Sequence, residues 1–182
     1  IWSLNGTPRH QPLAWLALAL SMAGTMAMSL SPFVERGVPV MANYVPVLDG
    51  PVFTSGLIMF GAGIATLCLR SMLAVVPVGA RISGEGALRF GLSAAMVSSA
   101  VAALAFAWSW LGVPRELDPR IYYELVFWGG GHVLQFTYTL LMLVCWIWLA
   151  AILGARLPLS PRIVTLLFAI ALLSVFLTPI TY

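Results

Sequence analysis

The sequence predicts an all-α integral membrane protein, a bundle of about five transmembrane helices that is a fragment of a larger bundle. Hydrophobic residues make up 61% of the 182 residues, and charged residues only 8%. Soluble domains carry roughly a quarter charged residues, so water would not solvate a surface of this composition. The second observation is a series of five apolar stretches, each near the ~20 residues that cross a hydrocarbon core. Together they argue against a soluble function.

The predicted helices occupy residues 12–30, 52–76, 87–113, 121–153 and 163–180, within a single transmembrane domain. Backbone polar groups in lipid must be satisfied inside the segment, which leaves helices as the spanning structure. The fourth stretch is the longest, so we expect it to tilt or to project into one interface. Loops containing Pro and Gly connect the stretches, the longest over residues 31–51. Glycine and serine recur in the first three stretches and predict close helix packing.

The two ends of the sequence suggest a piece of a longer protein. Ile1 stands where a Met would start a chain, and Tyr182 closes an apolar run. No charged leader with a cleavage site precedes the first stretch, so we expect no signal peptide. Cys68 and Cys145 lie within apolar stretches and are expected to be small hydrophobic residues rather than metal ligands. His10 precedes the first stretch and is expected to be a solvated loop residue.

Arginine supplies all nine basic residues, and its distribution predicts the orientation. If the helices alternate in direction, six arginines share one side of the membrane: Arg9, Arg70, Arg81, Arg89, Arg156 and Arg162. Arg36, Arg115 and Arg120 lie on the other side, where most acidic residues gather. Cytoplasmic loops carry an excess of arginine, so we expect the chain to start in the cytoplasm and to cross a bacterial inner membrane several times. No basic cluster interleaved with aromatic residues indicates a nucleic-acid partner.

The fourth stretch carries the chemical information. Asp118 and Pro119 predict a capped helix start. Spacings of three and four residues place a polar set on one helix face: Glu124, Trp128, His132, Gln135 and Thr139. Polar groups deep in a membrane are costly and seek partners or a lined cavity. Two interpretations of His132 therefore stay open: a hydrogen bond to a neighbouring helix, or a role as ligand or proton relay.

Three consecutive glycines, Gly129 to Gly131, precede His132. A glycine in a helix interior costs about 1 kcal/mol relative to alanine. Close approach of another helix would offset this cost, and so would clearance for a bulky cofactor. The sequence leaves both explanations open.

This segment resembles the sixth helix of subunit I of the heme-copper oxidases. In cytochrome c oxidases that helix commonly reads Phe-Trp-x-x-Gly-His-Pro-Glu-Val-Tyr, and Phe127, Trp128, Gly131 and His132 match it position for position. Tyr123 matches an upstream tyrosine. The resemblance implies that the five stretches correspond to the third to seventh helices of that family. The third helix of the family starts in the cytoplasm, in agreement with the arginine distribution.

The resemblance also implies cofactors and roles. His132 would be a ligand of the copper that faces a heme, with Trp128 and Gly131 beside the cofactors. Gln135 and Thr139 would support the ligand or form part of a proton path. The whole protein would reduce oxygen, or nitric oxide in a reductase branch, while the cofactors carry the redox chemistry. Its partners would be the lipid bilayer, other oxidase-type subunits and a cytochrome or quinol electron donor.

Some positions depart from the cytochrome c oxidase pattern. Val133 and Leu134 replace the proline and glutamate, and Phe136 replaces the tyrosine, which nitric oxide reductases also lack at this position. No histidine pair closes the last stretch, which leaves two alternatives open: the pair follows Tyr182, or this protein lacks it. In the family the heme ligands lie on the second and tenth helices, outside this segment in either case. Two other functions stay open: a non-catalytic membrane scaffold of the same fold, and an ion-coupled transporter or channel whose fourth helix breaks at the glycines.

Overall fold

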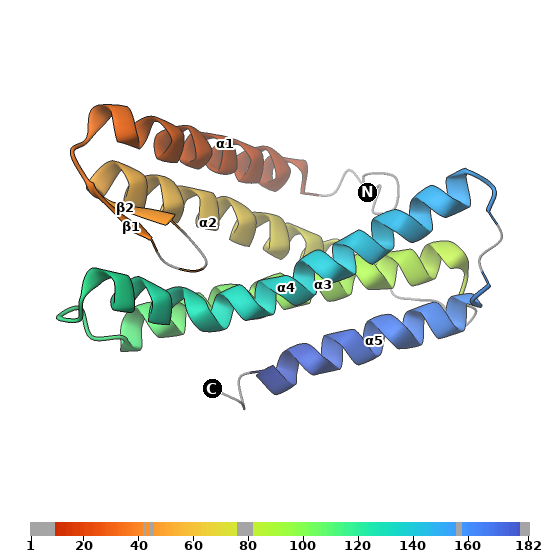
Figure 1. Cartoon of the computed structure of the whole chain (residues 1–182). Coiled ribbons are helices and arrows are strands. Elements are labelled where there is room, and N and C mark those ends of the chain that lie inside the picture. Colours follow the sequence, from red (N-terminus) through yellow and green to blue (C-terminus); the bar gives the residue numbers. More distant parts are fainter. Residues whose placement is uncertain (1–9, 42, 44–45, 76–81, 156–157, 179–182) are drawn as a thin grey trace.

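The computed structural model describes residues 10–41, 43, 46–75, 82–155 and 158–178, and it confirms the all-α class (Figure 1). The described residues form five helices: α1 (Gln11–Val34), α2 (Pro51–Leu73), α3 (Gly84–Gly112), α4 (Pro119–Ile152) and α5 (Pro161–Leu177). A small antiparallel hairpin of β1 (Val38–Met41) and β2 (Pro46–Asp49) lies between α1 and α2. The predicted end of the fifth stretch, at residues 179 and 180, lies outside the described residues.

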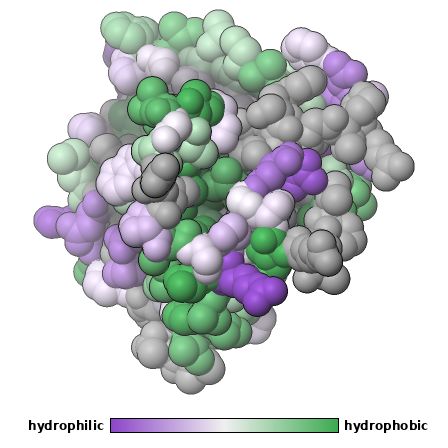
Figure 2. Space-filling view, turned by 90° about the vertical axis from the view of Figure 1, so that its right-hand side faces the viewer, coloured by the Kyte–Doolittle hydropathy of each residue, from purple (hydrophilic) through white to green (hydrophobic). Residues whose placement is uncertain are grey.

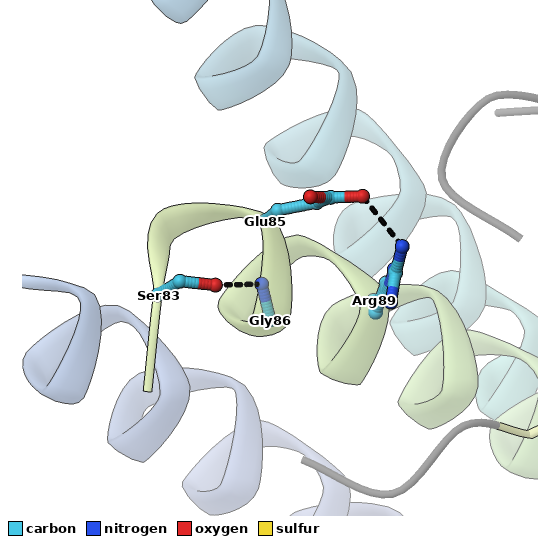
Figure 3. Close-up of polar contacts among 4 residues, drawn as sticks. All are labelled: Ser83, Glu85, Gly86 and Arg89. Atoms are coloured by element: carbon cyan, nitrogen blue, oxygen red, sulfur yellow. Dashed lines mark hydrogen bonds and ion pairs between the residues drawn. The ribbon is translucent and has the colours of Figure 1, made fainter. Parts of the chain in front are cut away.

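Helix starts follow from capping side chains and from proline. The Asp118 carboxylate accepts a hydrogen bond from the Arg120 backbone N–H at 3.0 Å, and Pro119 is the first residue of α4, as predicted. Ser83 accepts from the Gly86 N–H at 3.0 Å, so α3 begins three residues earlier than predicted (Figure 3). Proline as first residue needs no hydrogen-bond partner for its nitrogen, because the first helical amides have none within the helix.

The predicted loop over residues 31–51 is wrong in its first part, because α1 continues through Pro32 to Val34. Proline has no N–H to donate to the carbonyl of Met28, four residues earlier. The hydroxyl of Ser31 donates to that carbonyl instead, at 2.8 Å, and the residue is fully buried. The neighbouring serine thus satisfies the acceptor that proline leaves, and the helix does not end there.

The rest of the predicted loop is a hairpin whose two ends are held by Glu35. Its carboxylate accepts from the backbone N–H groups of Val52 at 2.8 Å and Phe53 at 2.9 Å, so the end of α1 caps the start of α2. Gly50, the residue before α2, has no side chain to perform this role, and a Cβ there would collide with the Glu35 carboxylate. Four extended residues in each strand form this hairpin, in a segment whose prolines had favoured the interpretation as a loop.

Helix α3 is the centre of the bundle, because it contacts α2, α4 and α5 (Figure 1). It buries nine residues, mostly alanine, glycine and serine, whereas α1 buries three. A core of Leu88, Leu92, Leu140, Val144 and Phe168 joins α3, α4 and α5. The outer helix α1 packs on α2 through glycine: a Cβ on Gly24 would lie 2.5 Å from the carbonyl oxygen of Gly56. Small residues therefore permit close packing, as predicted.

The outer surface of the bundle is apolar. Large side chains such as Phe33, Trp108 and Leu111 are 80–85% exposed. Among the described helices, α1 to α4 are long and apolar enough to cross a membrane, whereas α5, with 17 residues, is shorter. The composition and lengths are thus those of a multi-pass membrane protein, and within the described ranges four helices rather than five have full spanning length.

Charged residues lie at the two ends of this apolar body. We call one the hairpin end, defined by the hairpin with Glu35, Asp49, Arg115 and Asp118. We call the other the arginine end, defined by Arg70, Glu85, Arg89 and Arg162, where α2 and α4 finish and α3 and α5 begin. Figure 2 looks onto the arginine end, where hydrophilic residues lie among hydrophobic ones.

Replacing Glu35 with alanine is expected to lower the free energy of unfolding by about 1–2 kcal/mol, because α2 loses two capping hydrogen bonds and a favourable charge at its start. Thermal unfolding in detergent measures the effect. Glu116→Ala is the matched control, an exposed acid at the same end, and its effect should stay within about 0.5 kcal/mol. Equal losses in both variants would show that the carboxylate does not cap α2.

Candidate functional site on helix α4

The predicted polar face of α4 points away from the rest of the described bundle. The buried residues of α4 follow the other side of the helix: Tyr122, Val126, Phe127, Gly130, Val133, Thr137, Leu140 and Val144. At 3.6 residues per turn, Gln135 lies roughly 180° from the centre of this buried stripe, and His132 about 120° from it. Gln135 and Thr139 are accordingly exposed, and Trp128 is 42% exposed.

His132 is half-buried and is held by Trp128, one turn earlier. The imidazole Nδ1 lies 2.9 Å from the Trp128 backbone carbonyl oxygen, and the ring centroids are 5.1 Å apart. A carbonyl oxygen only accepts, so this contact is a hydrogen bond when Nδ1 carries the proton. The lone pair of the neutral ring is then on Nε2. A backbone carbonyl that fixes the tautomer in this way is typical of metal-binding histidines.

The other predicted residues do not converge on His132 through any described contact. The Glu124 carboxylate accepts from the backbone N–H of Asn43 at 3.1 Å, so it ties α4 to the hairpin. The Thr139 hydroxyl donates to the Gln135 carbonyl oxygen at 2.9 Å, within its own helix. Of the other four residues, only Trp128 is in described contact with His132.

Helix packing accounts for Gly130 but not for Gly129. A Cβ on Gly130 would lie 2.5 Å from the Phe106 ring of α3, whereas a Cβ on Gly129 would meet nothing within 4 Å. Phe106 is itself packed edge-on against Phe127, with ring centroids 5.5 Å apart. At Gly130 the bulky neighbour is therefore an aromatic side chain of the same chain. Helix α4 continues through all three glycines without a break.

A buried hydroxyl cluster, which the sequence did not single out as a network, joins α3 to the inner side of α4. Thr137 donates to the Ser98 hydroxyl at 3.0 Å, and Ser98 donates to the Val133 carbonyl oxygen at 3.3 Å. Ser99 donates to the Ala95 carbonyl oxygen at 3.0 Å. The sequence signal for this cluster was the position of Thr137, seven residues after Gly130 and therefore on the same face of the helix. These groups are paired and serve packing.

A second feature that sequence analysis missed is a cavity of about 220 Å³ at the hairpin end. Its lining combines the hairpin, the end of α3 and the start of α4: Asp49, Trp110, Arg115, Leu117, Pro119, Tyr122 and Tyr123. The Arg115 guanidinium carbon lies 5.6 Å from the centroid of the Trp110 ring, a cation–π contact. A larger groove, of about 430 Å³, runs along the outer side of α1 and is almost wholly apolar.

The described residues alone do not complete a copper or heme site. Within the described ranges, no group of three or more His, Cys, Asp or Glu side chains is placed to hold a metal ion. Neither the cavity nor the groove is lined by His132. One imidazole does not make a stable metal centre, since protein sites for copper and zinc use three or four ligands. Any complete site on this face needs side chains from outside the described residues.

The fold is that of a multi-pass helical protein. The side of α4 that carries His132 is polar and lies outside the core of the described bundle. No family model matches the chain, and no solved structure matches it. It is 27% identical over 133 residues to an uncharacterized protein of Rickettsia prowazekii (strain Madrid E), covering 70% of this chain and 25% of that protein. It is 28% identical over 162 residues to an uncharacterized protein of Aquifex aeolicus (strain VF5), covering 89% of this chain and 38% of that protein. The chain thus spans well under half the length of either relative.

The two glycines offer a matched pair of substitutions. Gly129→Ala is expected to stabilise the helix by up to about 1 kcal/mol, because the new methyl group meets open space. Gly130→Ala is expected to destabilise the protein by about 1–3 kcal/mol, because the methyl group collides with Phe106. Thermal unfolding of both variants in the same detergent distinguishes them. Stabilisation by both would contradict the packing of Phe106 on Gly130.

Proposed function

We propose that this chain is part of a larger membrane-embedded oxidoreductase subunit of heme-copper oxidase type, with His132 as one of its copper ligands. The observation that carries the proposal is the Trp128–His132 arrangement, in which the Trp128 carbonyl orients the imidazole on the side of α4 opposite its buried residues. The greater length of both relatives supports the proposal, because further helices would supply the missing ligands and the heme pocket.

In this proposal the residues of this chain orient and shield the copper ligand His132, while residues outside the chain complete the metal site. The Trp128 carbonyl fixes the imidazole tautomer, and its indole ring packs against the imidazole. Gly131 keeps the backbone before His132 free of a side chain. The exposed Gln135 and Thr139 continue the polar face by one and two turns, and are proposed to support the ligand or pass protons. Copper and heme supply the redox chemistry when bound.

We also infer that the protein lies in a bacterial inner membrane with its arginine end in the cytoplasm. The support is the division of the nine arginines, six against three, between the two ends. Both relatives come from bacteria. A cytochrome or quinol would be the electron donor, and other oxidase-type subunits would be partners. Both would bind surfaces formed in part by residues outside this segment.

A second candidate is a non-catalytic membrane scaffold of the same fold. The packing of Phe106 on Gly130 favours it, because one of the three glycines then needs no cofactor beside it. The transporter hypothesis has less support, since it depends on a break in the fourth helix and α4 is continuous from Pro119 to Ile152.

The test is metal and heme analysis of the natural full-length protein purified from membranes. We expect heme absorbance and copper in the wild type, and a loss of copper affinity of tenfold or more in His132→Ala, since even residues behind a metal ligand contribute 10–100-fold. His10→Ala is the control, because His10 is exposed at the start of α1, and it should keep its copper. A wild type without heme and copper would refute the oxidase and leave the scaffold.

Orientation is tested by single cysteines in a background without Cys68 and Cys145, which are both free thiols. A cysteine at Ser83, at the arginine end, should react with a membrane-impermeant maleimide only after the cells are opened. A cysteine at Pro114, at the hairpin end, should react in intact cells. The reverse pattern would overturn the assignment of the arginine end to the cytoplasm.

A further inference from the structure

The cavity of about 220 Å³ at the hairpin end has two opposite charges in its wall, Asp49 at the end of β2 and Arg115 between α3 and α4. It lies where the hairpin, the end of α3 and the start of α4 come together (Figure 1). Both residues are exposed. Within the described ranges the only ion pair lies at the other end of the bundle, between Glu85 and Arg89. The acid and the arginine thus line one cavity without being paired with each other.

Aromatic rings form much of the remaining wall and hold Arg115 in place. Its guanidinium carbon lies 5.6 Å from the centroid of the Trp110 ring. Trp110 is packed edge-on against Tyr122, with ring centroids 6.4 Å apart, and Tyr122 against Tyr123, at 5.1 Å. A cation–π contact needs no hydrogen bond, so the N–H groups of the guanidinium can still donate to an anion. The cavity therefore offers hydrogen-bond donors from Arg115 and acceptors from Asp49.

The depth of the cavity matches the headgroup region of a bilayer. Helix α3 has 29 residues, a length of about 44 Å at 1.5 Å per residue. Centred on a hydrocarbon core of ~30 Å, it would extend about 7 Å beyond the core at each end. Trp110 lies two residues before Gly112, the last residue of α3, or about 3 Å from its end. Its ring therefore lies just outside the hydrocarbon core, where tryptophan and tyrosine are enriched.

We propose that this cavity binds the headgroup of a phospholipid that carries a primary ammonium group beside its phosphate, as phosphatidylethanolamine does. The planar guanidinium of Arg115 suits two oxygens of the phosphate, and the Asp49 carboxylate accepts from the ammonium group. A volume of about 220 Å³ equals that of about seven water molecules at ~30 Å³ each. A phosphoethanolamine group fits, because its atoms are bonded and pack more closely than separate waters. The proposal does not rest on the role of His132.

The surroundings of the cavity favour a lipid over a soluble zwitterion, because apolar side chains are exposed beside it. Trp108 and Leu111, near Trp110 on α3, are 80% and 85% exposed, and Ile121, next to Tyr122, is 52% exposed. These side chains provide a surface for acyl chains. The charges select the headgroup, since a purely anionic lipid meets the like charge of Asp49. A quaternary ammonium group has no N–H to donate to that carboxylate.

The test uses the natural full-length protein in detergent and counts bound lipid by native mass spectrometry. We expect dioleoyl phosphatidylethanolamine to bind more tightly than the phosphatidylcholine or phosphatidylglycerol with the same chains. Arg115→Gln should weaken binding of all three, which share the phosphate, by up to about fivefold, the strength of one exposed ion pair. Glu116→Gln and Arg120→Gln are the matched controls. Both residues are exposed charges at the same end that do not line the cavity, and the variants should change lipid binding little.

Asp49→Asn distinguishes lost recognition from a folding defect. It should weaken phosphatidylethanolamine binding and strengthen phosphatidylglycerol binding, because the acid no longer repels the anionic headgroup, and misfolding does not produce such a gain. Equal affinity for the three lipids would overturn the proposal, and so would equal losses in the control variants. Binding of free phosphoethanolamine as tight as that of the lipid would show that the acyl chains contribute nothing, and would overturn the assignment to a lipid.

Discussion

The rotation of α4 about its own axis is the constraint on which the rest of the structure depends. It is set by contacts with α3: the Phe106 ring fills the step at Gly130, and Ser98 bonds both the Thr137 hydroxyl and the Val133 carbonyl oxygen. Hydroxyl groups in an apolar core are costly unless they form hydrogen bonds, and the space left by a glycine is filled only by a side chain of matching shape. Together they leave α4 one way to face α3. Every other residue of α4 takes its environment from this choice.

The same choice turns the Trp128–His132 pair outward. A polar face exposed to lipid is unfavourable, so its natural surroundings are protein or a polar cavity. Both relatives are much longer than this chain, which agrees with a face completed by further helices. The position of His132, at the edge of the exposed face rather than its centre, keeps the ring half-buried beside Trp128.

Much of the fold could be predicted because membrane helices are encoded by composition and length. The start of α4 was also predictable, since Asp118 and Pro119 are local signals. The extension of α1 was not, because Ser31 satisfies the carbonyl that Pro32 leaves unpaired. The inward face of α4 was not predictable either. Periodicity placed His132 and four other residues on one polar face but did not show on which side of the helix α3 packs. Contacts with Ser98 and Phe106 bury the side of Thr137 instead.

The two ends of the bundle are built on different physical principles. At the hairpin end, acids hold backbone N–H groups: Glu35 caps α2, Asp118 caps α4, and Glu124 holds the hairpin through Asn43. Three of the five acids at this end thus form hydrogen bonds within the protein. At the arginine end the one acid of the described residues, Glu85, pairs with one nitrogen of Arg89. The uneven division of arginines between the two ends is therefore the basis of the proposed orientation in the membrane.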